Sequence, residues 1–468
     1  MTKNAVVFTI IILVMLNFFN TAYSQENITV YLNGKQIKFD VPPVLDKGRT
    51  LVPFRQLSEA LGVEVAWEKN TGTVYGYRSD VKIALKINSQ VAYVNGKATE
   101  LDMPAVIKQR RTFVPLRFFS ETFGATVLWD GVTKTVTIST GLTPKHIMGF
   151  YYSSSFKDYS KNYSRLTSIA NKWYTIDDHG NLVDNDYSRY IFVPQGYEEV
   201  LRIAKQNGIR VYALLFENDP DKLHRVLIDK NNRYRLIKQI CEMVEAFQYD
   251  GVNIDFERIR EKDGEYFSRF IKELAHSLPK NKVLSVSLPA KTEKADWHKA
   301  YDYEVLGHYA DLVAIMAYDK NPGRPGPQAP INWVEDVIDY TKARIPGNKI
   351  LLGIGYYGYE WKNNRRKSTV SLSRDGLVYG IKLLDDIIEK YDVTVSWDDT
   401  AQTPYIKYTD EYGQKAEIWY ENASSLWAKF QLVKQKNLQG IALWRLGYAD
   451  SDFWRLVEEN FQVQKQGM

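Results

Sequence analysis

The sequence predicts an α/β protein: a (β/α)8 (TIM) barrel preceded by a duplicated small α+β module. Three observations support this fold class. From about residue 146, short apolar runs alternate with helical stretches, and before that point the chain repeats its own sequence. One apolar run also carries acidic residues at alternate positions. With 468 residues, 44% of them hydrophobic, the chain is long enough for several packed domains.

The second part of the chain, residues 143–468, contains eight candidate strands. Because helical stretches separate them, the pattern favours βα units, a parallel sheet and closure into a barrel. Residues 362–420, before the last strand, combine one helical stretch with short alternating strands, which indicates a small α+β insertion. The predicted strands are 147–152, 172–176, 209–216, 251–257, 283–289, 312–318, 350–357 and 440–444.

The first part, residues 26–142, is a tandem repeat with copies at about 28–80 and 90–140. Residues 33–35 recur at 95–97 and residues 49–55 at 111–117, with nothing inserted between the matches. Each copy has an Asn-Gly hairpin turn, a proline that can open a helix and a glycine that can end it.

This pair of repeats resembles the copper amine oxidase N-terminal-like domain of exported bacterial proteins. All six histidines lie between His146 and His308, outside the repeats, so we expect no copper or other metal there. A spacer role or attachment to the cell wall is the expected function of the repeats.

The N-terminus predicts export. Lys3 precedes an apolar run from residue 5 to 19, and Ala22-Tyr23-Ser24 has the small-x-small pattern of a cleavage site, so residues 1–24 form a predicted signal peptide. An uncleaved membrane anchor is the alternative. We therefore expect a secreted or cell-surface bacterial protein.

Composition excludes several other classes. Cys241 is the single cysteine, so no intrachain disulfide can form. The net charge is only +5 and no Lys/Arg stripe stands out, which argues against nucleic-acid binding. We expect a monomer without cofactors.

The fourth predicted strand carries the chemistry. Side chains alternate along a strand, so Asn253, Asp255 and Glu257 share one face and point into the barrel, away from the apolar face. A buried polar row is costly unless its members are paired or functional. A structural polar network is the alternative to an active site.

Residues 250–257 resemble the D-G-x-D-x-D-x-E signature of glycoside hydrolase family 18, the chitinase family. Asp250, Asp255 and Glu257 match the motif, whereas Asn253 replaces its second Asp. The family's other motifs also have counterparts: Met316, Tyr318 and Asp319 after the sixth strand, Tyr357 after the seventh, Trp444 ending the eighth, and Tyr151 and Tyr152 ending the first.

The resemblance implies a retaining, substrate-assisted glycosidase that cuts β-1,4-linked N-acetylglucosamine in peptidoglycan or chitin. It makes Glu257 the proton donor, with Asp255 and Tyr318 on the acetamido group of the −1 sugar. Asn253 and residues 325–330 are similar to the spore-cortex-lytic branch. The rival interpretation is a non-catalytic lectin on the same barrel. The substrate-binding positions are Asp250, Asn253, Tyr151, Tyr152, Met316, Asp319, Tyr357 and Trp444.

We expect the mature protein to begin near Gln25, because the small-x-small site after the apolar run favours cleavage there. N-terminal sequencing of protein recovered outside the cells measures this directly. A recovered chain that starts at Met1 would contradict the prediction.

Overall fold

The computed structural model describes residues 28–465, except 33–34, 79–80, 132, 141, 295–296, 372–381 and 392. The chain divides into two compact units between residues 141 and 142. The predicted signal peptide lies outside the described residues. Within the described part, no helix has the length and apolar character needed to cross a membrane.

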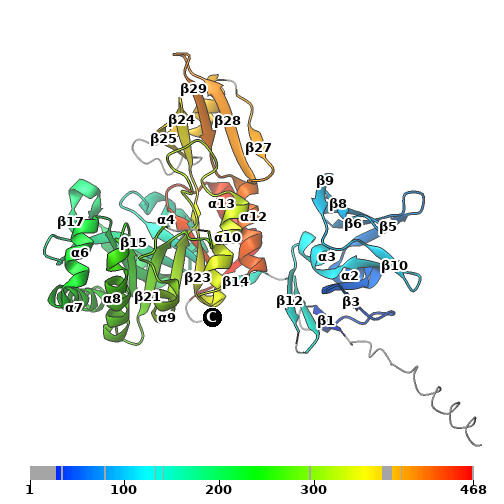
Figure 1. Ribbon diagram of the computed structural model, residues 1–468, viewed down its shortest axis with the longest axis horizontal. Helices are drawn as coiled ribbons and strands as arrows, with labels where there is room; N and C mark the ends of the chain where they lie inside the picture. Colours follow the sequence, from blue (N-terminus) through cyan, green and yellow to red (C-terminus); the bar gives the residue numbers. More distant parts are fainter. Residues whose placement is uncertain are drawn as a thin grey trace, which may run out of the picture. The chain divides into compact units, whose positions relative to one another are not determined.

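The second unit is a closed barrel of eight parallel strands, as predicted (Figure 1). Each strand pairs in parallel with the next, and the last pairs with the first at residues 146–149 and 440–443. The strands are β14 (Thr143–Tyr151), β15 (Ser168–Ile176), β19 (Arg210–Glu217), β20 (Gly251–Phe256), β21 (Val283–Pro289), β22 (Leu312–Met316), β23 (Ile350–Gly355) and β30 (Gly440–Trp444).

Helices cover the outside of the barrel (Figure 1). They are α4 (Phe156–Asn162), α5 (Tyr197–Gln206), α6 (Pro220–Ile228), α7 (Lys230–Ala246), α8 (Gly264–Ser277), α9 (Tyr303–Tyr309), α10 (Ile331–Lys342), α12 (Ala423–Gln435) and α13 (Ser451–Asn460). Short elements fill the connections: η1 (Tyr163–Arg165), β16 (Leu182–Val183), β17 (Asn185–Asp186), η2 (Tyr187–Arg189), β18 (Ile191–Phe192), η3 (Glu261–Asp263), η4 (Gly347–Lys349) and β31 (Phe461–Val463).

The barrel unit has an outer and an inner core. Val252, Ile254 and Phe256 belong to the outer core, between strands and helices, as the alternation along β20 predicts. Met148 and Phe150 belong to the inner core, inside the barrel. The two faces of each strand therefore meet different surroundings. Because side chains alternate along a strand, neighbouring residues point into different cores.

The insertion is a six-stranded sheet with one helix, and it stands apart from the barrel layers (Figure 1). Its first strand begins at Gly358 rather than at about residue 362, because residues 358–362 pair antiparallel with two insertion strands. Its helix spans Leu384–Tyr391 and follows residues 382–383, which pair with β25. The elements are β24 (Gly358–Lys362), β25 (Arg365–Ser371), β26 (Lys382–Leu383), α11 (Leu384–Tyr391), β27 (Ser396–Asp398), β28 (Thr403–Thr409) and β29 (Lys415–Trp419).

The first unit contains the two repeats, which share one core rather than forming two separate modules. Copy one consists of β1 (Thr29–Leu32), β2 (Lys35–Gln36), β3 (Val44–Asp46), β4 (Arg49–Pro53), α2 (Phe54–Leu61), β5 (Glu64–Glu68) and β6 (Thr73–Arg78). After β7 (Val81–Lys86), copy two consists of β8 (Val91–Val94), β9 (Lys97–Glu100), β10 (Val106–Lys108), β11 (Arg111–Pro115), α3 (Leu116–Thr122), β12 (Thr126–Asp130) and β13 (Thr135–Ser139).

The copies exchange strands. The closing strands of copy two, β12 and β13, form a sheet with the opening strands of copy one, β1 and β2. The closing strands of copy one join the opening strands of copy two through β7. Between β4 and β11, Val52 pairs with its own repeat equivalent Val114, and the neighbouring pairs are symmetric about this one. A pseudo-twofold axis therefore relates the two copies.

Close strand packing in the barrel requires glycine, most tightly at Gly251 and Gly440. A Cβ added to Gly251 would lie 2.0 Å from the Val283 carbonyl oxygen, and one added to Gly440 would lie 1.9 Å from the His146 carbonyl oxygen. Real Cβ atoms do not approach backbone atoms so closely, so any larger residue must separate the strands.

We expect Gly251→Ala to lower the free energy of unfolding by about 1–3 kcal/mol or more, the usual cost of overpacking a rigid core. Chemical denaturation measures this change. Gly323→Ala is the matched control, because nothing lies within 4 Å of a Cβ added there. Equal stability of the two variants would contradict the strand geometry described here.

Candidate active site

The polar face of β20 ends in two carboxylic acids inside the barrel. Asp255 is 3% exposed, and Glu257 directly follows the strand with its side chain partly buried. The Glu257 backbone N–H donates to the carbonyl of Glu217 (2.8 Å), which fixes this strand end against its neighbour β19. Catalytic groups of (β/α)8 enzymes lie at this carboxyl end of the strands.

Lys172 on β15 is the counter-charge of this acidic pair, and sequence reasoning missed it. Burial lowers the pKa of Lys172, while Asp255 and Glu257 act in the opposite direction. Its Nζ lies 3.3 Å from the centre of the Phe216 ring and 5.0 Å from that of Trp444, so aromatic faces support the cation. Lys172 is the first residue of the predicted strand 172–176. At a strand end it is hardest to predict toward which face a side chain points.

Both carboxyl groups hold their protons more strongly than free acids. Burial first, and then the charge of Glu257, raise the pKa of Asp255 to about 7, against the lowering effect of Lys172. Burial also raises the pKa of Glu257, with Lys172 opposing and Asp319 adding to the rise. At neutral pH the pair can therefore hold a proton that ordinary carboxylates would lose.

Asn253 lies one step below Asp255 and is completely buried. Its Nδ2 donates to Ser285 Oγ (2.9 Å), and its Oδ1 accepts from Ser287 Oγ (3.1 Å). The amide is thus held by β21 and places no charge beneath Asp255. Asp255 Oδ1 has no hydrogen-bond partner among the described residues, so one acceptor remains available inside the site.

A tyrosine cluster faces the carboxylates from the ends of β22 and β23. Asp319 has φ of 58° and accepts hydrogen bonds from the hydroxyls of Tyr357 and Tyr359, each at 2.8 Å. The Tyr318 and Tyr357 rings lie 6.4 Å apart, centre to centre. Burial, and then the charge of Asp255, raise the pKa of Tyr318, so its hydroxyl stays protonated. Met316 ends β22 and is partly buried.

Glycines on β23 make room for these rings. A Cβ on Gly353 would lie 2.3 Å from the Ile315 carbonyl oxygen and 3.0 Å from Tyr318 Cε1, and one on Gly355 would lie 2.9 Å from Tyr357 Cε1. Gln328, from the loop after β22, donates from Nε2 to the carbonyls of Gly355 (2.9 Å) and Tyr357 (2.6 Å). The loop of residues 325–330 therefore holds the backbone that carries Tyr357.

Trp444 lies at the end of β30, between Phe150 and Lys172. Its ring centre is 5.5 Å from that of Phe150, in an edge-to-face contact. The next residue, Arg445, stacks its guanidinium 4.7 Å from the centre of the Tyr152 ring, so Tyr152 belongs to this end of the barrel.

Two predicted site residues do not reach the site. Tyr151 faces the outer core, where it contacts Trp173 and Tyr159, and Phe150 is the inward side chain of that pair. Asp250 precedes β20 at the opposite end of the barrel, and its carboxylate accepts from the backbone N–H of Val211 (2.8 Å). Both predicted substrate contacts are replaced by structural ones.

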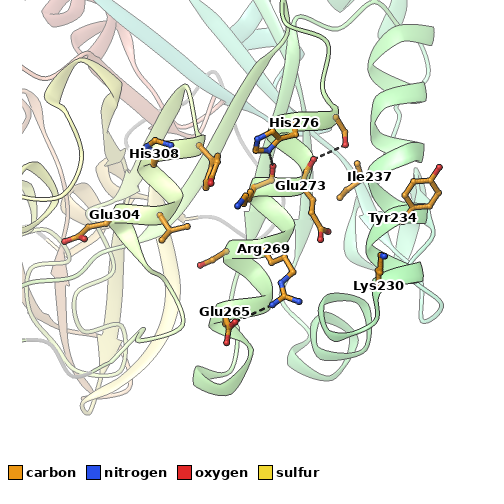
Figure 2. Close-up of a pocket in the computed structure, with 14 residues that line it drawn as sticks. Lys230, Tyr234, Ile237, Glu265, Arg269, Glu273, His276, Glu304 and His308 are labelled. Atoms are coloured by element: carbon orange, nitrogen blue, oxygen red, sulfur yellow. Dashed lines mark hydrogen bonds and ion pairs between the residues drawn. The ribbon is translucent and has the colours of Figure 1, made fainter.

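A separate groove of about 1030 Å³ lies on the helical surface, between α7, α8 and α9. Figure 2 shows its side chains coming from these three helices, with Tyr234 at one side, His308 at the other and His276 between them. None of the strand-end carboxylates line it, so its volume says nothing about the chemistry of the barrel.

A closed eight-stranded barrel with acidic groups at the carboxyl ends of its strands is a known architecture of glycosidases. Residues 146–449 match glycosyl hydrolases family 18, and the chain belongs to this family. Residues 31–138 match the copper amine oxidase N-terminal domain.

Several relatives are spore-cortex enzymes. The chain is 32% identical over 247 residues to the cortical fragment-lytic enzyme of Bacillus anthracis, covering 52% of this chain and 56% of that protein. The Bacillus subtilis (strain 168) counterpart is 32% identical over 253 residues, covering 53% and 58%. The chain thus spans little more than half the length of these curated relatives.

Solved structures give the same picture. The Bacillus cereus spore cortex-lytic enzyme SleL matches with a TM-score of 0.62 and 26% identity, over 70% of this chain and 77% of that one. A chitinase from Chromobacterium violaceum ATCC 12472 matches with a TM-score of 0.61 and 26% identity, over 68% and 98%.

We expect Lys172→Met to move the alkaline limb of the kcat/KM profile to higher pH. Removing the cation takes away the group that favours the ionised carboxylates, so their pKa rises and the acid form persists further into the alkaline range. Hydrolysis of a soluble chitooligosaccharide across pH measures this limb. Lys205→Met, at an exposed position on α5, is the control and should leave the profile unchanged. A downward shift in Lys172→Met would contradict the charge arrangement.

Proposed function

We propose that the protein is an exported, retaining glycosidase that hydrolyses β-1,4-linked N-acetylglucosamine in bacterial peptidoglycan. One observation carries the proposal. Glu257 and Asp255, both with raised pKa values, lie at the same strand end, and Asp255 Oδ1 lacks a partner among the described residues. An acid and an adjacent free acceptor are what substrate-assisted cleavage of an N-acetylated sugar needs.

Glu257 acts as the proton donor in the first step. Burial raises its pKa, which favours the protonated form that passes a proton to the glycosidic oxygen as that bond breaks. The acetamido oxygen of the −1 sugar attacks the anomeric carbon and forms an oxazolinium ring, so the substrate itself supplies the nucleophile. The commoner glycosidase scheme, in which a second enzyme carboxylate attacks the sugar, therefore does not apply.

Asp255 positions the acetamido group for that attack. Its unpartnered Oδ1 can accept the acetamido N–H, and its ionised form, which Lys172 favours, stabilises the positive ring. The protonated Tyr318 hydroxyl hydrogen-bonds the same group. In the second step, Glu257 takes a proton from water, which attacks the anomeric carbon from the face the leaving group left, and the configuration is retained.

The remaining side chains hold the sugar and tune charge. Trp444 is the platform of the −1 sugar, because its ring lies at a strand end next to Lys172. Asp319 and Tyr357 form one wall through their mutual hydrogen bond, with Met316 and Tyr152 beside it. Asn253 acts from below by keeping the second position of the acidic row neutral. The proposal requires no metal or cofactor.

Peptidoglycan is the favoured substrate, ahead of chitin. The relatives of highest identity described above are named for cortex lysis. A cleaved signal peptide over residues 1–24 and attachment to the wall through the repeats fit the same setting. We propose that the enzyme acts as a monomer.

We expect Glu257→Gln to lower kcat by about 10²–10⁴-fold on a soluble oligosaccharide, since the variant keeps the shape but loses the acid. Asp255→Asn should also be severely impaired. Glu261→Gln, a nearby exposed glutamate, is the control and should retain activity. Mass spectrometry of digested peptidoglycan and colloidal chitin, side by side, identifies the bond cut.

Three outcomes contradict this proposal. Binding of oligosaccharide without turnover by the unmodified protein would support the lectin interpretation. Efficient hydrolysis of a substrate with plain glucose at −1 would exclude the acetamido nucleophile. Release of products from chitin but not from peptidoglycan would exclude the proposed substrate.

A further inference from the structure

We propose that the N-terminal module binds wall glycan at two symmetry-related sites, a groove at Trp67 and the corresponding surface at Trp129. The ligand class is an amino-sugar polymer that carries carboxylate groups. The choice of this ligand rests on the proposed function of the barrel, whereas the two sites follow from the groove at Trp67 and the symmetry of the module.

The first groove has a volume of about 600 Å³ and combines residues of both copies. Trp67 on β5 is 47% exposed and stands opposite Ile107 of copy two, which is 56% exposed. A half-exposed indole at the side of a groove offers a flat apolar face, which suits the C–H face of a sugar ring. The volume falls in the usual range of small-ligand sites.

The polar lining favours an anionic ligand. Arg111 is paired with Asp40 (2.8 Å), but Arg55 and Arg110 are exposed and form no ion pair among the described residues. Gln56 Oε1, also in the lining, is buried and has no hydrogen-bond partner in the described part of the chain. The groove therefore offers two free guanidinium groups for carboxylates.

The pseudo-twofold axis repeats this arrangement. Trp129 on β12 is the equivalent of Trp67 and is 37% exposed, and Leu45 replaces Ile107 and is 41% exposed. Arg117 stands for Arg55, and the ion pair between Arg49 and Asp102 corresponds to the one between Arg111 and Asp40. Gln56 is replaced by Phe118 and Arg110 by Gly48, so the surface at Trp129 is more apolar than the groove at Trp67 and has fewer arginines.

A repeating polymer suits two symmetry-related sites better than a single small ligand does. Two weak sites that engage one chain give an avidity above either single affinity. Both tryptophans lie on edge strands, which raises the rival idea that a protein strand pairs with the edge. β5 carries Glu64 and Glu68 along its exposed length, and charged edges oppose such pairing.

The test uses the full chain carrying Glu257→Gln, so that the polymer stays intact, and measures binding to purified insoluble peptidoglycan by sedimentation. We expect Trp67→Ala and Trp129→Ala each to weaken binding about threefold to tenfold, and the double variant by more than either alone. Tyr93→Ala is the control, because Tyr93 is 50% exposed on the same module and lies outside the first groove. Trp67→Phe should restore part of the binding, which separates ring stacking from loss of folding.

A second experiment tests the contribution of the arginine charges separately from contacts with the sugar rings. Arg55→Ala together with Arg110→Ala should weaken binding to peptidoglycan stripped of its phosphate polymers, and should leave binding to neutral chitin unchanged. If stripping alone abolishes wild-type binding, the phosphate polymer is the ligand and the proposal fails.

Two further results distinguish a failure of the binding sites from a failure of the proposed function. If the double tryptophan variant binds as well as Tyr93→Ala, the two sites do not bind glycan. Turnover of a soluble oligosaccharide, measured in chains that keep Glu257, reports on the barrel separately. If the barrel shows no turnover while binding to the wall still depends on Trp67 and Trp129, the proposed function of the barrel is wrong and the binding sites of the module stand.

Discussion

The burial of Asp255 inside the barrel is the constraint on which the catalytic end depends. An ionised carboxylate away from water is costly unless another charge or a hydrogen bond compensates it. Lys172 supplies the charge, and its own burial is made tolerable by the faces of Phe216 and Trp444. Asn253 is neutral and bonded to two serines. The protonation of Asp255 and Glu257 therefore depends on Lys172 and not on a second acid below Asp255.

The regular parts of the fold could be predicted from the sequence. All eight barrel strands were expected, since apolar runs separated by helical stretches leave few alternatives. Along β20, alternation alone placed Val252 toward the helices and Asp255 and Glu257 inside, because that strand has no irregularity. The roles proposed for these acids remain predictions that the kinetic experiments decide.

Irregular positions could not be predicted in the same way. The pairing of β15 with β19 shifts between Lys172 and Tyr174, so Trp173 and Tyr174 both belong to the outer core and simple alternation fails there. Tyr151 was predicted to lie in the site because it ends a strand. The alternation along β14 points Phe150 into the barrel instead. Asp250 belongs to the sequence motif, yet its carboxylate serves the backbone of β19 at the opposite barrel end.

The strand exchange in the N-terminal module has a consequence for the order in which the chain can fold. A ribosome releases the N-terminal end first, but residues 29–32 find their parallel partner only at residues 135–138. Copy one cannot complete its sheets while it is the only copy synthesised. The module must therefore fold as one cooperative unit after both copies have been synthesised. Until then its first strand has no native parallel partner.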